Sequence, residues 1–326
     1  MRNVVCGLLV LALLLGTAAA QDGVLSWVDF DVGAAPLRRA LELDIASQET
    51  EQPLDWVELL ALAATRTGGG QFPASQVDAA ARDFQSGASP QALLGSLYSY
   101  YESYKQAYGA VLDGLVGHYA VRLPDETGQL TWKATYGLKA FSPIAEGFSY
   151  THYQDFGNRR GYGFQRRHLG NDLMGASGTP IVAIEGGTVE ALGWNQYGGW
   201  RIGIRSDDRL RYYYYAHLQK DNPYAEGLAE GKRVEAGEVI GYLGRTGYST
   251  RENTENIQTP HLHLGLQLVF DESQKECNSE IWVDVYALVE LLSTHRSTVA
   301  RDPETGAWRR VYGYWDLDRA PLPAGA

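Results

Sequence analysis

Hydrophobic and polar positions divide the chain into a helical first part and a β-rich second part. In "LLGSLYSYYESYKQAYGAVLDGLVGHY" (residues 93–119), large apolar side chains recur every three or four positions, which is the period of a helix with one packed face. These positions are Tyr101, Tyr104, Tyr108, Val111, Leu112 and Leu115. The spacing predicts a long helix whose tyrosines form a packing face, and a tyrosine-lined binding groove is the less favoured interpretation.

A second helix is predicted upstream, in "WVELLALAATRTGGG" (residues 56–70). Pro53 and Asp55 are start signals, and three glycines at 68–70 stop the helix. Its apolar positions at helical spacing are Trp56, Leu59, Leu60 and Ala63. We therefore expect residues 21–134 to form a helical N-terminal domain, with a helical sequence pattern to about residue 130.

From about residue 135 the pattern changes to short β-rich runs separated by glycines. These runs include "TPIVAIEGGTVEALGW", "GWRIGIRS", "LRYYYYAHL" and "EVIGYLGRTG", and no helical period interrupts them until "VDVYALVELLSTH". Consecutive strands with tight turns favour an antiparallel sheet over alternating βαβ units. The predicted fold class is α+β, with a mainly antiparallel β domain over residues 135–297 and a C-terminal extension over residues 298–326.

The first 20 residues have the layout of a secretory signal peptide. One arginine is followed by an apolar stretch (residues 4–15) that is too short to span a bilayer comfortably, and then by small residues that end at Ala20. The chain is therefore expected to be secreted. After cleavage only Cys277 remains, so an intrachain disulfide is not expected.

Composition narrows the class of partner. The 326 residues are 44% hydrophobic and 21% charged, as in a folded globular protein, and the net charge is −11. No run of lysine or arginine resembles a nucleic-acid-binding arm. Nucleic acid is not an expected partner, because binding to phosphates needs clustered positive charge.

Two histidines lie one residue apart in "TPHLHLGLQLVF", which has the composition of a strand. On a strand, His261 and His263 would point to the same face, roughly 6.5–7 Å apart along the chain. This placement lets one imidazole bind a metal while the other reaches the metal's water. A plain pair of surface histidines is the alternative.

Further donors occur upstream, in "RRHLGNDLMG" and "YYYYAHLQK". His168 and Asp172 are four residues apart, next to glycines that favour a strand or loop, and both are zinc-donor types. With one histidine of the later pair they would give the three protein ligands typical of catalytic zinc. His217 is expected on another strand, with Tyr215 on the same face. A surface ion pair and a packed strand histidine are the respective alternatives, whereas His118, His152 and His295 have no comparable setting.

Three of these segments, "HLGND", "YYAHL" and "HLHLG", resemble the motifs of the lysostaphin-type (LytM-like) zinc metallopeptidases, which are peptidoglycan endopeptidases. The resemblance covers about residues 140–290 and includes glycine-marked strands such as "GKRVEAGEVIGYLGRTG". It implies a lysostaphin-type peptidase domain with one Zn²⁺ bound by His168, Asp172 and His263. It also implies that His217 and His261 flank the metal-bound water, without showing which is the general base.

The resemblance implies a secreted, wall-facing endopeptidase that hydrolyses stem peptides or cross-links of bacterial peptidoglycan. The main alternative is a non-catalytic scaffold or activator in a cell-envelope complex, and the complete ligand set argues against it. A structural zinc module fits poorly, because such sites usually have four protein ligands and are commonly cysteine-rich.

Two regions depart from the family pattern. Residues 248–260, "YSTRENTENIQTP", lengthen the link before the His-x-His strand, and we expect them to border the cleft and affect substrate preference. The helical N-terminal domain lies outside the resemblance. We expect it to regulate the enzyme or to dock an envelope protein partner.

Overall fold

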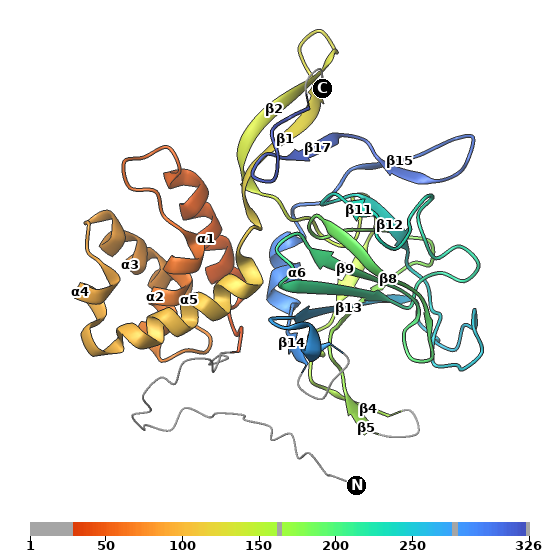
Figure 1. The fold of residues 1–326 in the computed structure, drawn as a ribbon, viewed down its shortest axis with the longest axis horizontal. Coiled ribbons are helices and arrows are strands. Elements are labelled where there is room, and N and C mark those ends of the chain that lie inside the picture. The colour runs from red at the N-terminus through yellow and green to blue at the C-terminus, as the bar shows by residue number, and fades with distance from the viewer. Residues whose placement is uncertain (1–28, 162–164, 276–279, 324–326) are drawn as a thin grey trace.

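The computed structural model describes residues 29–161, 165–275 and 280–323, and in it helices lie on one side and sheets on the other (Figure 1). The predicted signal peptide and Cys277 lie outside the described residues. Within those residues, none of the helices combines the length and the apolar character needed to cross a bilayer. The observed order of helices followed by a mainly antiparallel β part confirms the predicted fold class.

The first helices begin and end where their sequence signals lie. The Asp55 side chain accepts a hydrogen bond from the Glu58 amide at the start of α2, and Gly68 ends the helix with a left-handed φ of 79°. The helices are α1 (Ala34–Ser47), α2 (Trp56–Thr67), α3 (Ala74–Gln85), α4 (Pro90–Leu94), a short 3-10 helix (Gly95–Leu97) and α5 (Tyr98–Leu112). The start and the stop predicted for the second helix are both confirmed.

The tyrosine-rich helix is shorter than predicted. Its stripe is buried from Tyr101 to Leu115, which confirms the packing face. However, α5 ends at Leu112, and Gly114 turns the chain with a φ of +80° into the strand β1 (Val116–Pro124). The prediction of helical texture to about residue 130 was wrong, because one left-handed glycine redirects the backbone there.

A three-stranded sheet projects above the helices (Figure 1) and joins distant parts of the chain. Strand β1 pairs with β2 (Leu130–Leu138) on one side and with β17 (Gly313–Asp316) on the other. The predicted boundary between residues 134 and 135 falls inside β2, and β17 comes from the predicted C-terminal extension. The division into domains stays a prediction.

The main sheet has eight antiparallel strands in the order β11-β8-β9-β10-β13-β6-β3, with β14 also paired to β13. Strand β13 lies between β10 and β6, and places His263 opposite Asp172 in register. The bounds are β3 (Tyr150–His152), β6 (Asn171–Gly175), β8 (Gly187–Asn195), β9 (Gly199–Ser206), β10 (Arg211–Ala216), β11 (Arg233–Val234), β13 (His261–Leu268) and β14 (Ile281–Val283).

The remaining elements border this sheet. Strands β4 (Arg159–Gly161) and β5 (Gln165–Arg167) form a small hairpin directly before His168. The other pairs are β7 (Pro180–Val182) with β12 (Val239–Tyr242), and β15 (Val299–Arg301) with β16 (Trp308–Arg310); a 3-10 helix spans Glu272–Gln274.

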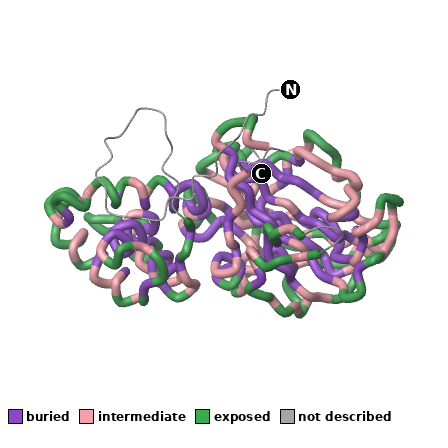
Figure 2. Tube along the Cα trace, turned by 90° about the horizontal axis from the view of Figure 1, so that it is seen from below, coloured by how far each residue is buried: buried purple, intermediate pink, exposed green. Residues whose placement is uncertain are grey.

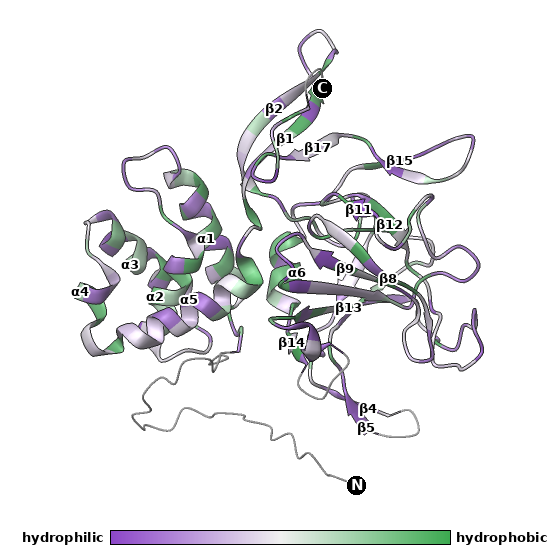
Figure 3. Cartoon of the chain, viewed as in Figure 1, coloured by the Kyte–Doolittle hydropathy of each residue, from purple (hydrophilic) through white to green (hydrophobic). Residues whose placement is uncertain are grey.

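Helix α6 (Tyr286–Leu292) stands between the helical part and the main sheet, and hydrophobic residues dominate it (Figure 3). It packs against α1, and one cluster of buried hydrophobic residues runs through both parts of the molecule. Buried positions accordingly occur in both parts and where they meet (Figure 2). Burial of this apolar surface holds the helices against the sheet.

A buried ion pair reinforces the contact between the two parts. The Arg211 Nε donates to both oxygens of Glu185, at 3.2 and 3.1 Å, and the Arg211 Nη1 donates to the Ala110 carbonyl at the end of α5, at 3.3 Å. The same guanidinium pairs with Asp208 at 2.8 Å, and Glu185 accepts from the Tyr213 hydroxyl. We call Arg211, Glu185, Asp208 and Tyr213 the joint cluster.

Candidate metal centre

A pocket of about 260 Å³ lies where polar residues of β5, β6, β10 and β13 come together. It contains all five residues predicted for the site, and none of its lining residues belongs to the helical part. The lining residues are Arg160, Arg166, His168, Asp172, Tyr197, Gly198, Tyr214, His217, Tyr248, His261 and His263.

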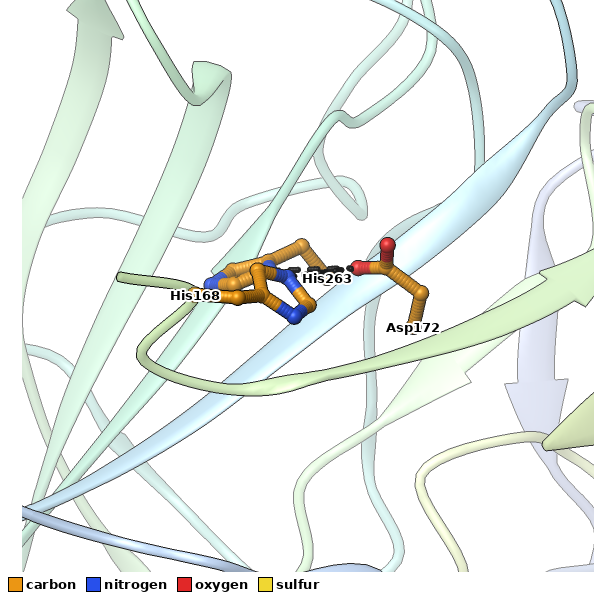
Figure 4. A group of neighbouring side chains, drawn as sticks. All are labelled: His168, Asp172 and His263. Carbon is orange, nitrogen blue, oxygen red and sulfur yellow. Dashed lines mark hydrogen bonds and ion pairs between the residues drawn. The ribbon is translucent and has the colours of Figure 1, made fainter. Parts of the chain in front are cut away.

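Three donor side chains meet at one point in this pocket (Figure 4). His168 lies in the loop before β6, Asp172 in β6, and His263 in β13. The His168 Nε2 is 2.8 Å from the His263 Nδ1 and 3.1 Å from the Asp172 Oδ1, and the last two atoms are 3.2 Å apart. These three atoms form a nearly equilateral triangle.

The triangle has the size and chemistry that zinc requires. Tetrahedral zinc with bonds of about 2.0–2.1 Å separates its ligand atoms by about 3.3 Å. The observed separations of 2.8–3.2 Å are close to that value. Two imidazole nitrogens and one carboxylate oxygen are also a common catalytic set. The three residues therefore fit a zinc ion, although other divalent metals accept the same donors.

Hydrogen bonds orient His168 for this role. Its Nδ1 lies 3.1 Å from the Asp155 carbonyl, which fixes the proton on Nδ1 and leaves the Nε2 lone pair directed at the cluster. Burial opposes a positive charge on this ring, but the hydrogen bonds to Asp155 and Asp172 outweigh it and raise the pKa of His168 to about 9. Without a metal, the ring therefore takes up a proton on Nε2, the position that a metal cation would occupy.

The carboxylate of Asp172 is held ionised. Burial alone would raise its pKa, but hydrogen bonds from His168 and His263 lower it far below the usual range. Arg160 donates to the other Asp172 oxygen at 3.1 Å. Both oxygens therefore have partners, and the charge needed in a metal ligand is present.

Gly170 is required for the approach of His263. A Cβ at this position would lie 2.7 Å from the His263 Cε1 and 2.5 Å from the Leu264 carbonyl oxygen. Both distances are shorter than real contacts of a Cβ atom, so a larger residue would displace the ring or the strand. The glycine in "HLGND" thus lets the loop pack on the ligand.

His217 and His261 share one arrangement beside the donor triangle. The Nδ1 of His217 lies 2.9 Å from the Thr246 carbonyl, and the Nδ1 of His261 lies 2.9 Å from the Thr259 carbonyl. A carbonyl oxygen accepts only, so each ring carries its proton on Nδ1 and keeps an Nε2 lone pair. The ring centroids are 4.8 Å apart, and the His261 Nε2 lies 3.7 Å from the Asp172 Oδ1.

Both histidines are buried, and His217 is held neutral. Burial and the nearby rings of His261 and His263 hold the pKa of His217 well below its usual range. A neutral imidazole with a free Nε2 is a proton acceptor. The pocket therefore combines a potential metal centre with two potential bases.

The prediction that His217 extends a strand with Tyr215 was wrong. Strand β10 ends at Ala216, and His217 has a φ of +62°. This left-handed residue turns the imidazole into the pocket, whereas the Tyr215 hydroxyl points into the core and accepts from the Ile184 amide. Tyr214 lines the pocket instead. Simple alternation failed because the strand ends one residue earlier.

The remaining histidines lie outside the pocket. His118 is exposed on β1, His152 stacks on Tyr286, and His295 binds the Ala140 carbonyl through Nδ1. Asp155, Arg160 and Arg166, by contrast, surround the cluster and were not predicted as site residues. For the two arginines, the signal in the sequence was "NRRGYGFQRR" (residues 158–167), where arginine pairs flank glycines just before His168.

Comparison with known proteins agrees with this geometry. Residues 166–276 match the profile of peptidase family M23. An L-Ala–D-Glu endopeptidase of Bacillus subtilis is 42% identical over 130 residues, which are 40% of this chain and 38% of that protein. The glycyl-glycine endopeptidase ALE-1 of Staphylococcus capitis is 37% identical over 32% of this chain and 28% of its own length. The chain thus spans less than two fifths of these relatives.

Among solved structures, the lysostaphin catalytic domain of Staphylococcus simulans is 30% identical, with a TM-score of 0.33, over 43% of this chain and 92% of that one. A chain from Ruminococcus gnavus described as a glycyl-glycine endopeptidase is 26% identical, with a TM-score of 0.48, over 80% of this chain and 91% of that one. The family match lies within the β-rich part of the chain, and the family resemblance predicted from its motifs is confirmed.

Proposed function

We propose that the chain is a zinc-dependent endopeptidase that hydrolyses peptide bonds in bacterial peptidoglycan. The observation that carries this proposal is the union, in one pocket, of a three-donor cluster with two histidines that keep Nε2 free. The match to peptidase family M23 and the endopeptidase names of the relatives support the same reaction.

In this proposal His168 holds the zinc through Nε2, His263 through Nδ1 and Asp172 through Oδ1. A zinc ion there would supply a Lewis acid and lower the pKa of a bound water to about 7. Asp155 keeps the His168 ring in the required tautomer, and Arg160 orients the Asp172 carboxylate. The chain itself thus presets the ligand directions.

His217 and His261 are assigned the proton transfers. One Nε2 would accept a proton from the attacking water and could then pass this proton to the leaving amine. The other ring could hydrogen-bond the oxygen that gains charge only when its Nε2 is protonated. The Thr246 and Thr259 carbonyls prevent either ring from exposing Nδ1 to the pocket. Separate variants of the two histidines are needed to assign the roles.

The substrate class comes from the relatives. One is named for an L-Ala–D-Glu bond and another for a glycyl-glycine bond, and both names describe endopeptidases. For this chain we propose a peptide bond of the stem or the cross-link. Such a substrate lies outside the cytoplasm, in keeping with the signal peptide predicted for residues 1–20.

The helical part is proposed to regulate the enzyme or to dock an envelope protein. It lines none of the pocket, and it exposes Leu97 and Tyr100, at 44% and 42% of their surface. A double change of Leu97→Ser and Tyr100→Ser should therefore alter localisation or partner capture while leaving purified activity intact. Unchanged localisation and capture would contradict the docking role.

The direct test is digestion of purified peptidoglycan by residues 21–326, with released muropeptides identified by mass spectrometry. Parallel samples contain a chelator or carry His263→Ala. New peptide-bond cleavage that both controls abolish establishes the endopeptidase and identifies its bond. Stoichiometric zinc without any cleavage would instead favour a zinc-bearing scaffold of a cell-envelope complex.

A further inference from the structure

Arg166 lies in β5, two residues before His168, and its guanidinium contacts two aromatic rings of the pocket. Its Cζ lies 5.5 Å from the ring centroid of Tyr197 and 5.5 Å from that of Tyr248. Its Nη2 donates to the Tyr248 hydroxyl at 2.5 Å. Cation–π contact and this hydrogen bond fix the plane of the guanidinium at the wall of the pocket.

The positive charge of Arg166 has no carboxylate partner among the residues that the structure describes. No acidic side chain there comes within 4.0 Å of it, and its Nε is buried without a hydrogen-bond acceptor. The Arg166 side chain is half-buried and lines the pocket, so its guanidinium can be reached by an anion that enters the pocket.

Arg160, on the other strand of the hairpin, shows the contrasting case. Its Nη2 binds the carboxylates of both Asp155 and Asp172. These two carboxylates neutralise the charge of Arg160, and its role is to orient Asp172, one of the three proposed zinc ligands. Arg167 has its side chain on the opposite face of β5 and is exposed. Only Arg166 of these three combines a place in the pocket with an unmatched charge.

The other residues that line the pocket carry little negative charge that would repel an anion. Asp172 is the only carboxylate among its lining residues, and its charge is already shared by His168, His263 and Arg160. The other lining residues are tyrosines, histidines, a glycine and arginines. Repulsion of a substrate carboxylate is therefore small.

We propose that Arg166 binds a carboxylate of the substrate peptide next to the scissile bond, so that this enzyme prefers acidic peptides to neutral ones. The planar guanidinium offers parallel N–H donors that match the two oxygens of a carboxylate. The rings of Tyr197 and Tyr248 beside the guanidinium reduce its contact with water, which strengthens such a pair. This inference rests on the proposed endopeptidase function, and it selects a glutamyl-type site over a run of glycines.

The test compares two synthetic peptides that differ only in a carboxylate or a carboxamide beside the scissile bond. The full chain should show a kcat/KM for the carboxylate that is about tenfold to a hundredfold higher, as expected for hydrogen bonds to a charged group. Arg166→Gln should bring the ratio of the two kcat/KM values close to one. Arg166→Lys should keep part of the preference for the carboxylate peptide. Arg167→Gln is the matched control and should keep the whole preference.

Binding to the metal-depleted full chain separates this inference from the proposed function. By calorimetry, the carboxylate peptide should bind more tightly than the carboxamide peptide, and Arg166→Gln should remove the difference with no loss of thermal stability. If no peptide is cleaved but this binding difference is found, the endopeptidase proposal fails and the role of Arg166 stands. Cleavage with equal kcat/KM for both peptides, or a preference that survives in Arg166→Gln, overturns the role of Arg166 alone.

Discussion

The joint cluster and the pocket cluster are both largely buried groups of charged and polar side chains, but they differ in whether the protein itself satisfies all of their polar atoms. In the joint cluster, Arg211 is shared by Glu185, Asp208 and the Ala110 carbonyl, and Tyr213 donates to Glu185. In the pocket cluster (His168, Asp172, His217, His261 and His263), hydrogen bonds fix one side of most rings and leave nitrogen lone pairs directed at a common space. The polar atoms of the joint cluster are satisfied within the protein, whereas the pocket cluster leaves donor atoms available to a ligand.

This difference shows why burial of charge alone does not identify a functional site. A closed network contributes to a unique arrangement of the helices against the sheet, and removal of one member leaves its partner buried and unpaired. An open network keeps donor atoms unsatisfied until a metal, water or substrate completes it. Four variants, in decreasing order of expected effect, test whether the two clusters act in these separate ways.

The largest effect is expected for His263→Ala, which removes one of three zinc donors. We expect loss of bound zinc and a fall in peptide hydrolysis of at least about a thousandfold, because two remaining ligands hold the metal poorly. Metal analysis and a hydrolysis assay measure both quantities. The exposed His118→Ala should change neither, and full zinc content in His263→Ala would remove this residue from the ligand set.

A smaller effect on hydrolysis is expected for His217→Ala and His261→Ala, measured separately. Each should retain zinc and lower kcat by about a hundredfold to ten-thousandfold, the range for a general acid or base. The metal content and kcat together distinguish these variants from His263→Ala. Loss of zinc in either one would move that histidine into the ligand set.

The joint cluster should respond in stability and not in chemistry. Arg211→Met leaves Glu185 buried without its cation, and should lower the free energy of unfolding by about 3–5 kcal/mol. Hydrolysis per zinc-loaded folded molecule should stay near the wild-type value. Denaturant titration gives the stability, and Arg209→Gln, which breaks an exposed pair with Glu272, should cost at most about 1 kcal/mol.

His152, which belongs to neither cluster, is expected to make the stability of the protein depend on pH. Its ring stacks on Tyr286, its Nε2 is buried with no hydrogen-bond partner among the described residues, and burial, only partly offset by Asp155, lowers its pKa to about 4. The unfolded chain, with a histidine pKa near 6.5, then binds more protons between pH 6.5 and 4. Stability should fall across that window as pH decreases, by up to about 3 kcal/mol.

His152→Phe keeps an aromatic ring at this position and removes the proton site. Thermal or denaturant unfolding between pH 4 and 7 should therefore show a shallower loss of stability in this variant than in the wild type. His118→Phe, at an exposed position, is the control. Identical pH profiles for His152→Phe and the wild type would rule out a neutral buried His152 as a source of acid sensitivity.

Local signals in the sequence were sufficient for much of the fold. Asp55 and the glycines at 68–70 bound α2, and apolar periodicity identified the buried face of α5, because capping and packing depend on neighbours within a few residues. The end of α5 was missed, since nothing in the spacing shows that Gly114 adopts a left-handed φ and starts the β1–β2 hairpin. The strand position of His217 failed for the same reason.

For the candidate site, the sequence by itself determined the residue types and the strand that carries His261 and His263. Their spacing of two puts both rings on one face of β13, and the family motifs singled out His168, Asp172 and His217. Tertiary structure decided the distances among the donors, because the pairing of β13 with β6 joins residues about 90 positions apart. It alone decided that Arg160 is neutralised while Arg166 is not, since ion pairing depends on which side chains meet across the folded hairpin and sheet.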